Sequence, residues 1–230
     1  MLKIAINGYG RIGRSFVRAL AEREAAGNAL PVRLVAINDL GRAEDLLYLT
    51  RYDTTHGRLE APAELVDGCL RIGDQSPRLF SEPEPEQLPW AELGVDVVLE
   101  CSGSFRARDD AARHLTARAG RVIVGAVPFD DADQTIVYGV NHDDLKPESR
   151  VLSAASCTTH CIAPVLAALD REFGVRQALM KEIHAYTSDQ TLLDHVHRDP
   201  RRGRAGAQNI IPTTSSAIKA VQNVLPALDA

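Results

Sequence analysis

Residues 2–13 read LKIAINGYGRIG, an apolar run that leads into three glycines spaced as G-x-G-x-x-G. Leu2 to Asn7 has the composition of a short buried strand, and Arg11 to Glu24 carries apolar side chains at helical spacing. A glycine-rich turn between a strand and a helix is the context in which this motif binds the pyrophosphate of a dinucleotide. The stretch therefore predicts a dinucleotide-binding fold.

Each glycine of the turn has its own predicted role. Gly8 makes the tight turn, Gly10 lets the backbone approach a pyrophosphate, and Gly13 allows the helix to pack closely. The amides near Arg11 and Ile12 would point at the phosphates from the helix N-terminus.

Strand-like runs recur along the first 150 residues, with helical patterns between some of them. The runs are Pro31 to Asn38, Val95 to Glu100, Arg121 to Val124 and Thr135 to Val140, and a helical pattern covers Arg108 to Ala119. Alternating strands and helices predict an α/β fold with a Rossmann-type, doubly wound parallel sheet. The acidic, proline-rich stretch Ser81 to Pro89 is expected to be a surface loop, because strand patterns of the same sheet follow it.

The second predicted strand ends in Asn38-Asp39, where the dinucleotide fingerprint expects an acid for the adenine ribose. Asp39 also suits the N-cap of a following helix, but the glycines favour the ribose role. A carboxylate there repels a 2′-phosphate, so the predicted cofactor is NAD and not NADP.

The pattern changes after Val151. The expected elements are a small polar stretch at Ser153 to Thr159, a helix running on to Phe173, a strand at Gln177 to Tyr186 and a helix at Ser216 to Leu225. Ser188 to Gln208 is rich in His, Asp and Arg without clear periodicity, and an irregular segment of that length is typical of a functional loop.

Cys157 lies at the predicted strand-to-helix junction Ser156-Cys157-Thr158-Thr159. Amide donors and the helix dipole stabilise a thiolate there. His184 would be its base, because a Cys and a His distant in sequence can form an activated nucleophile–base pair. The structural alternatives are a small core thiol and a strand histidine without a chemical role.

The other cysteines, Cys69, Cys101 and Cys161, are interpreted as free thiols. Cys157 and Cys161 lie one helical turn apart, but zinc needs two further ligands at a recognisable spacing, and no matching pair is found. No metal site is therefore predicted.

The overall composition is that of a globular protein, with 45% hydrophobic and 25% charged residues. A net charge of -5 disfavours a nucleic-acid groove, and no apolar run approaches the length that spans a bilayer. Met1-Leu2-Lys3 leads directly into the first strand and leaves no room for a signal peptide. We therefore expect a cytoplasmic protein without nucleic-acid or membrane partners.

Several motifs occur together: NGYGRIGR at 7–14, AINDL at 36–40, ECSG at 100–103, TIVYGVNH at 135–142, SCTT at 156–159, HAYT at 184–187 and QNIIP at 208–212. In this order and spacing the chain resembles the phosphorylating glyceraldehyde-3-phosphate dehydrogenases, with SCTT, HAYT and QNIIP as the specific signals. The resemblance implies an NAD-binding domain at residues 1–156 and part of an α+β catalytic domain at residues 157–230.

The resemblance also implies a mechanism. Cys157 would attack the aldehyde of glyceraldehyde 3-phosphate, and His184 would take the hydroxyl proton as hydride passes to NAD. The Cys157 amide and His184 would stabilise the oxyanion. Inorganic phosphate would then cleave the thioester to an acyl phosphate, as in glycolysis, and the protein would be a homotetramer.

Further site residues follow from the resemblance alone. Besides the glycine turn and Asp39, the cofactor site would include Asn7, Ser102 and Gly103. The phosphate groups would be bound by Ser156, Thr158, Thr187, Ser215 and Ser216. The pair Arg202 and Arg204 matches a loop that borders the active site and the subunit interface in the family, the alternative being a solvated face.

The chain departs from the family pattern around the predicted active site. His160 replaces the asparagine that usually follows SCTT, and Lys181 and Glu182 replace two small hydroxyl residues. Period-two alternation puts Glu182 on the same face as His184, where a carboxylate would raise the pKa of the histidine or compete for its proton.

Other departures concern binding and length. Ser215-Ser216 replaces Thr-Gly, and the arginine that usually approaches adenine is missing from SEPEPEQLPW. Family members continue for about another hundred residues, the size of a small domain, so the chain corresponds to a C-terminally truncated member. Two alternatives stay open: an erythrose-4-phosphate dehydrogenase, against which Thr187 in HAYT argues, and a catalytically inactive nucleotide-binding paralogue.

Overall fold

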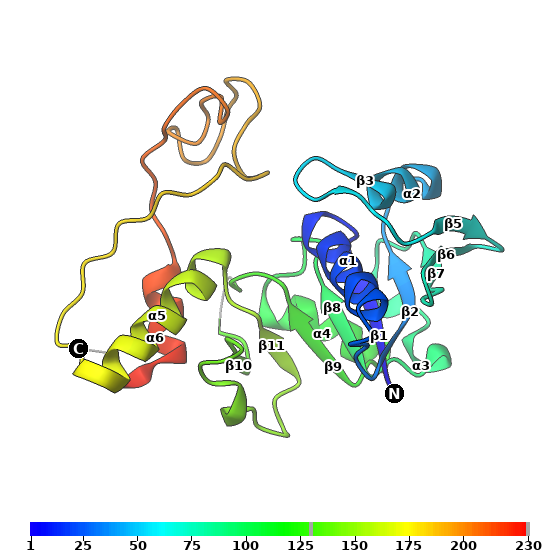
Figure 1. The fold of residues 1–230 in the computed structure, drawn as a ribbon, viewed down its shortest axis with the longest axis horizontal. Coiled ribbons are helices and arrows are strands. Elements are labelled where there is room, and N and C mark those ends of the chain that lie inside the picture. The colour runs from blue at the N-terminus through cyan, green and yellow to red at the C-terminus, as the bar shows by residue number, and fades with distance from the viewer. Residues whose placement is uncertain (129–130, 229–230) are drawn as a thin grey trace. The chain divides into compact units, whose positions relative to one another are not determined.

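The computed structural model describes residues 1–128 and 131–228 of the chain. It divides into two compact units, Met1–Ser156 and Cys157–Ala230. The named strands of the described residues lie in the first unit, and the second contains two α-helices with a long irregular segment between them (Figure 1).

The first unit is built on a sheet that has nine strands over the described residues. In spatial order they are β10 (Gln134–Thr135), β11 (Val151–Ser153), β9 (Arg121–Val124), β8 (Val97–Glu100), β1 (Leu2–Asn7), β2 (Val32–Asn38), β7 (Arg78–Phe80), β6 (Cys69–Ile72) and β5 (Ala63–Val66). Neighbours from β10 to β7 are parallel, and β6 and β5 pair antiparallel at one edge. The predicted doubly wound parallel sheet is confirmed, and the antiparallel edge is an addition to it.

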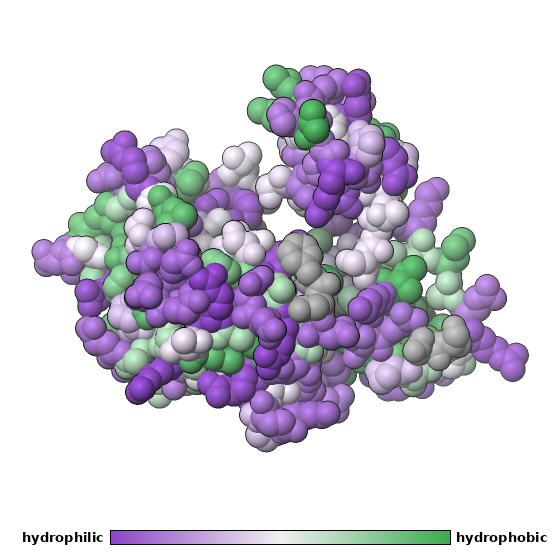
Figure 2. Space-filling view, turned by 180° about the vertical axis from the view of Figure 1, so that it is seen from behind, coloured by the Kyte–Doolittle hydropathy of each residue, from purple (hydrophilic) through white to green (hydrophobic). Residues whose placement is uncertain are grey.

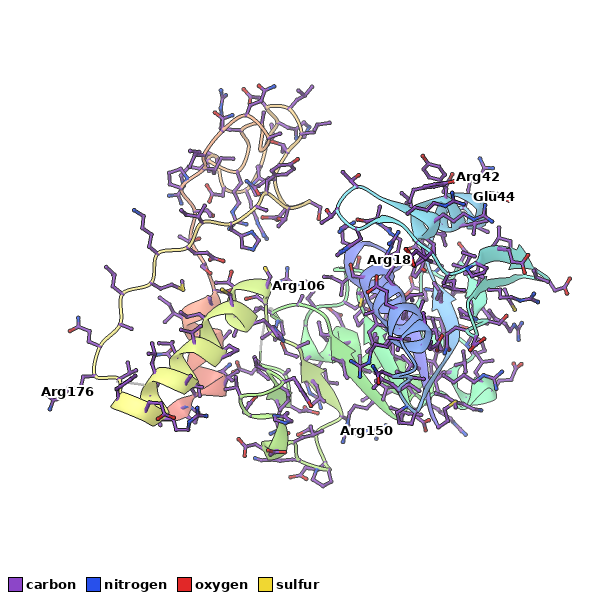
Figure 3. The ribbon with its side chains drawn as sticks, viewed as in Figure 1. Arg18, Arg42, Glu44, Arg106, Arg150 and Arg176 are labelled. Atoms are coloured by element: carbon purple, nitrogen blue, oxygen red, sulfur yellow. The ribbon has the colours of Figure 1, made fainter. Side chains whose placement is uncertain are left out.

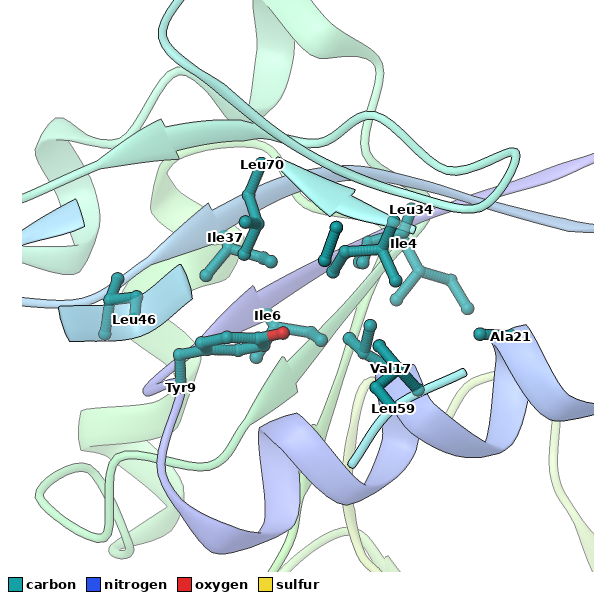
Figure 4. Packing of buried hydrophobic residues seen from close by; sticks show 12 residues of the cluster. Ile4, Ile6, Tyr9, Val17, Ala21, Leu34, Ile37, Leu46, Leu59 and Leu70 are labelled. Atoms are coloured by element: carbon teal, nitrogen blue, oxygen red, sulfur yellow. The ribbon is translucent and has the colours of Figure 1, made fainter. Parts of the chain in front are cut away.

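The α-helices of this unit are α1 (Arg11–Ala25), α2 (Ala43–Arg51), α3 (Trp90–Leu93) and α4 (Arg108–Thr116). α1 follows the predicted pattern, since Val17, Leu20 and Ala21 are buried at helical spacing. Figure 4 shows Val17 and Ala21 packed in one cluster with side chains of β1 and β2. Burial of each large aliphatic side chain stabilises such a core by about 1.5–3 kcal/mol.

Arg18 is a charged residue within this packing and is only 4% exposed. Arg18 lies on α1 (Figure 3). Its guanidinium donates to the carbonyl oxygens of Thr50 at 3.2 Å and Gly57 at 2.8 Å. Thr50 belongs to α2, and Gly57 belongs to a small hairpin of β3 (Tyr52–Asp53) and β4 (Gly57–Arg58). The carbonyls replace water around the buried charge, so Arg18 ties α1 to α2 and to the hairpin.

The direction of winding reverses at β1. The chain proceeds from β1 to β2 on one side and later enters β8 on the other side. The register pairs Asn7 at the end of β1 with Asn38 of β2 and with Glu100 of β8. Open α/β sheets bind ligands at the carboxyl ends of strands that flank such a switch point. The fold therefore places the Gly8 turn at the edge where a nucleotide is expected.

Two connecting segments, residues 81–89 and 135–142, can be compared with the structure that the sequence predicts for them. Ser81 to Pro89 is a loop, as predicted, with one 3-10 turn, η1 (Pro85–Gln87). The prediction of a strand at Thr135 to Val140 is wrong beyond Thr135, because β10 ends there. The Asn141 side chain accepts from the Val137 amide and donates to the Thr135 carbonyl, which turns the chain before a short 3-10 helix, η2 (His142–Asp144).

The second unit contains α5 (Cys157–Phe173), α6 (Ala217–Val224) and a 3-10 turn, η3 (Pro226–Leu228). The helices α5 and α6 pack against each other, and both agree with the predicted helices. The strand predicted at Gln177 to Tyr186 does not form over these described residues. Leu179 and Ile183 are almost fully exposed, and a strand needs a laterally bonded neighbour, which this segment lacks within the described part of the unit.

Candidate functional site

The turn after β1 is closed by a backbone contact. Gly8 has φ +89°, a conformation that favours glycine. A Cβ atom at this position would lie 2.3 Å from the backbone N and Cα of Ser102, which follows β8. The predicted tight turn therefore coincides with a close approach of two loops at the switch point, and it brings Gly8 and Ser102 together.

The other two glycines differ in their surroundings. A Cβ at Gly13 would lie 2.6 Å from the carbonyl oxygen of Gly8, so this glycine permits the close packing of α1. A Cβ at Gly10 would meet no atom within 4 Å. The first bond of the helix joins the amide of Arg14 to the carbonyl of Gly10, so the amides of residues 11–13 precede the internal ladder and are oriented to bind an anion.

Asp39 follows the last residue of β2, and its side chain binds the backbone of the same turn. Its carboxylate accepts from the amide of Tyr9 at 2.7 Å and from the amide of Gly41 at 2.8 Å. The N-cap alternative does not hold, because the N-cap of α2 is Arg42. The carboxylate fixes the loop that carries Gly8 and Gly10 and stays half-buried at the nucleotide edge.

A buried polar network joins the ends of the three central strands. Glu100 is 2% exposed, and its Oε1 accepts from the amide and the hydroxyl of Ser102 at 2.8 and 2.6 Å. Its Oε2 accepts from Asn7 Nδ2 at 2.6 Å and lies 3.0 Å from His114 Nε2. Asn38 Nδ2 in turn donates to Asn7 Oδ1 at 2.7 Å. Two predicted cofactor residues, Asn7 and Ser102, are therefore held by one carboxylate.

The orientation of His114 follows from its second nitrogen. Trp90 Nε1 donates to His114 Nδ1 at 3.0 Å, so the ring proton resides on Nε2 and is donated to Glu100. His114 and Trp90 are both fully buried. Sequence reasoning did not find this network; the available signal was an acid, Glu100, in the last position of a buried strand pattern.

The side chain of Arg11 is engaged away from the turn. Its guanidinium pairs with Asp53 of β3. Bonds from the His56 and Thr55 amides and from Arg11 hold the pKa of the Asp53 carboxyl at about 2. Arg11 would consequently serve a nucleotide through its backbone amide. Gly103, which has φ +78°, follows Ser102 in the loop after β8.

The second unit brings together Cys157 and His184. Cys157 is the first residue of α5, at the positive end of the helix dipole. Its Sγ lies 3.0 Å from His184 Nε2. His184 Nδ1 donates to the carbonyl of Ala185 at 2.5 Å, which directs Nε2 toward the sulfur. A nucleophile and its base require a contact of this kind.

Two further side chains adjoin this pair. Thr158 Oγ1 donates to Glu182 Oε1 at 2.6 Å, and the same Oε1 lies 4.0 Å from His184 Nε2. The Ala185 carbonyl, Cys157 and, to a smaller extent, Glu182 raise the pKa of His184. Glu182 therefore lies near the histidine, as alternation predicted, although the segment forms no strand.

The remaining predicted phosphate residues have local contacts. Ser156 directly precedes Cys157. The Thr187 amide donates to Gln190 Oε1 at 2.9 Å, and Ser215 Oγ accepts from the Ala217 amide at 3.2 Å. Ser216 occupies the N-cap position of α6 without a side-chain cap bond. Of these predicted phosphate residues, Thr158 contacts the cluster through its hydrogen bond to Glu182.

The arginines of the irregular segment form ion pairs within it. Arg202 pairs with Asp189 and donates to Thr213 Oγ1 at 2.7 Å, and Arg204 pairs with Asp194 at 2.5 Å. These contacts fold residues 188–208 into a compact loop with a bridge between Thr191 and Ala205.

Cys69, Cys101 and Cys161 are free thiols, and burial raises the pKa of Cys101 to about 12. Among the described residues, no group of three or more His, Cys, Asp or Glu is arranged to hold a metal ion. None of the helices in that part of the chain has the length and apolarity required to cross a membrane.

Each of the two units matches a known protein-family model. Residues 2–108 match the model of the glyceraldehyde 3-phosphate dehydrogenase NAD-binding domain, and residues 156–230 match that of the C-terminal domain. The chain is 46% identical over 228 residues to the plasmid-encoded glyceraldehyde-3-phosphate dehydrogenase of Cupriavidus necator. The chain belongs to the glyceraldehyde-3-phosphate dehydrogenase family. The chromosomal enzyme of the same organism is 45% identical, and in each comparison 99% of this chain covers 67% of the relative.

Membership of the glyceraldehyde-3-phosphate dehydrogenase family establishes NAD as the cofactor and an NAD-dependent oxidoreductase family. The first unit suits this cofactor. Gly10 leaves open space where a pyrophosphate would approach, and the amides of residues 11–13 begin α1 beside it.

Proposed function

We propose that this protein oxidises glyceraldehyde 3-phosphate with NAD and phosphorylates the product to 1,3-bisphosphoglycerate through a thioester on Cys157. The observation that carries this proposal is the 3.0 Å contact between Cys157 Sγ and His184 Nε2 at the N-terminus of α5. The match to the glyceraldehyde-3-phosphate dehydrogenase family supports the substrate class.

In the proposed reaction, His184 moves the proton and Cys157 forms the covalent bond. The imidazole of His184 takes the thiol proton, and the thiolate adds to the aldehyde carbon, whose oxygen receives that proton and becomes a hydroxyl group. His184 Nε2 then takes the proton of the new hydroxyl group as the carbonyl re-forms in the thioester. The amide of Cys157, at the start of α5, supplies a donor for the oxygen on which charge develops. NAD, when bound, would accept the hydride.

We propose that the first unit binds NAD and that the second binds substrate. The cofactor residues are Asn7, Gly8, Gly10, Arg11, Ile12, Gly13, Asp39, Ser102 and Gly103. The residues for the substrate phosphate and the attacking phosphate are Ser156, Thr158, Thr187, Ser215 and Ser216. The family resemblance further supports a cytoplasmic homotetramer.

The decisive experiment is NADH formation from glyceraldehyde 3-phosphate by the full chain and by Cys157→Ser. We expect the full chain to produce NADH and the variant to produce none, since serine is the weaker nucleophile. Erythrose 4-phosphate in parallel separates the triose from the tetrose activity. Absence of NADH with either substrate would remove the proposed activity and favour the inactive nucleotide-binding paralogue.

A further inference from the structure

A carboxylate lies beside the proposed nucleophile. Glu182 Oε1 is 4.0 Å from His184 Nε2, and the same Nε2 is 3.0 Å from Cys157 Sγ. The Glu182 side chain is 25% exposed, so solvent reaches it. Any molecule that attacks an acyl group on Cys157 from this side meets a negative charge.

This arrangement disfavours an anionic nucleophile. A phosphate group carries about −1.5 to −2 charges at neutral pH, and like charges a few ångström apart repel. The Thr158 hydroxyl already donates to Glu182 at 2.6 Å. Inorganic phosphate therefore meets both a like charge and a hydroxyl donor that is engaged by that charge.

The same carboxylate favours water as the nucleophile. A general base acts on a proton within hydrogen-bond reach or through one water molecule. Glu182 Oε1 can hold a water molecule next to the acyl group, while Thr158 keeps the carboxylate oriented. His184 Nε2 faces the sulfur and is positioned to stabilise it when it leaves as a thiolate.

We propose that Glu182 is a general base that directs part of the Cys157 thioester to water, so that the protein releases a free carboxylic acid alongside the acyl phosphate. The water oxygen bonds to the acyl carbon, and the carbon–sulfur bond breaks with its electron pair on Sγ. The water proton passes to Glu182 and then to solvent. The step needs no oxidant, because the aldehyde is oxidised when the thioester forms. The identity of the natural acyl group rests on the proposed function, whereas the role of Glu182 can be tested with any acyl group on Cys157.

The test uses p-nitrophenyl acetate, which acylates a reactive cysteine without NAD or an aldehyde. The full chain is compared with Glu182→Gln, which keeps the size of the side chain, and with Glu182→Thr, which supplies a hydroxyl group. Glu172→Gln is the matched control, since Glu172 is an exposed carboxylate at the other end of α5. The burst of p-nitrophenol measures acylation, and the steady rate with and without inorganic phosphate measures release.

We expect a burst that depends on Cys157, present in the Glu182 variants and lost in Cys157→Ser. Release by water should fall by about tenfold or more in Glu182→Gln, given that general bases contribute about 10²–10⁴-fold. Phosphate should accelerate release in both Glu182 variants and change the rate less than about twofold in the wild type and in Glu172→Gln. An unchanged water rate in Glu182→Gln, a wild type as phosphate-sensitive as the Glu182 variants, or a Glu182→Gln protein without a burst would each overturn the proposal.

The natural substrate separates the two proposals. NADH from glyceraldehyde 3-phosphate without added phosphate, accompanied by 3-phosphoglycerate, supports both the dehydrogenase activity and the water branch. NADH formed strictly with phosphate supports the former and overturns the latter. If no NADH forms, the dehydrogenase proposal fails, and the acetate measurement alone decides the role of Glu182.

Discussion

Cys157 is exposed, begins α5 and lies beside His184. We expect it to be alkylated fastest of the four cysteines at neutral pH, because it is exposed and lies at the helix N-terminus beside His184. Limited iodoacetamide labelling followed by peptide mapping gives the order. Cys161 is the internal control, since it is also exposed on α5 but one turn further along. Earlier labelling of Cys69 or Cys101 would contradict the assignment.

The pH dependence of this labelling tests His184. The contacts that raise its pKa favour the imidazolium form, which stabilises an adjacent thiolate. Loss of that charge in His184→Ala should slow labelling by about tenfold at pH values below the pKa of His184. As the pH rises through that pKa, the wild-type imidazole becomes neutral, so the difference between the two proteins should shrink. A ratio that stays constant with pH would show that His184 does not act through its charge.

Asp39 is expected to select NAD over NADP, because its carboxylate repels a 2′-phosphate. The wild type should prefer NAD by about tenfold or more, and Asp39→Asn should bring the ratio of the two affinities close to one. Calorimetric titration with both nucleotides measures this ratio. The ratio is the proper readout, since Asp39 also binds the Tyr9 and Gly41 amides and its loss weakens the loop itself. Asp45→Asn, an exposed acid of α2, should leave the ratio unchanged.

Among the elements, the turn between β1 and α1 allows two glycines to be compared. Gly8→Ala should destabilise the first unit by more than about 2 kcal/mol, because of its positive φ and the contact with Ser102. Gly10→Ala should change stability by less than about 1 kcal/mol, yet weaken NAD binding at least tenfold, since its methyl group enters the space of the pyrophosphate. Urea unfolding and calorimetric titration separate the two effects. Unimpaired NAD binding by Gly10→Ala would place the nucleotide elsewhere.

The strand ends that meet at the switch point depend on Glu100. Glu100→Gln should lower the free energy of unfolding by about 3 kcal/mol, because an amide cannot accept all the bonds made to the carboxylate, and donors are left unpaired. Glu64→Gln is the control, since Glu64 forms an exposed pair with Arg71, and its loss should cost less than about 1 kcal/mol. Equal urea midpoints for the two variants would contradict the role of the network.

Elements that rely on local pattern were predictable from the sequence. α1 and the strands β1, β2 and β9 carry their own periodicity or β-branched runs, and the glycine spacing predicted the tight turn between β1 and α1. The bonds of Glu100 with His114 were not predictable, because His114 lies in an ordinary helical pattern and meets Glu100 only once β8 and α4 are packed. The expected strand at 177–186 failed for the converse reason, since a strand depends on neighbours that local pattern does not supply.

At the scale of the whole molecule, the two units differ in how much apolar surface they cover. The first unit buries continuous clusters on the sheet, whereas the irregular segment of the second exposes Leu179, Ile183, Val196 and Ile210 by more than 90%. Figure 2 shows apolar side chains scattered among a largely hydrophilic surface. The second unit therefore has less hydrophobic burial to oppose local opening.

Limited proteolysis should reveal this difference. We expect trypsin to cut first at Arg176 and Lys181, in an exposed segment without regular structure. A fragment close to Met1–Ser156 should persist much longer, because its arginine and lysine sites lie in a packed sheet unit. Mass spectrometry of early time points identifies the cuts. Initial cleavage within β1 to β9 would show that the first unit is the less stable one.

The buried Trp90 also gives this protein a built-in optical reporter. It is the only tryptophan of the chain, and its indole N–H is joined through His114 to Glu100, which holds Asn7 and Ser102. Tryptophan emission should therefore follow the opening of the nucleotide edge, while the second unit contributes no tryptophan signal at all. Loss of helix from α5 and α6 would register in circular dichroism with the emission spectrum unchanged, so the two units can be observed separately in one unlabelled sample.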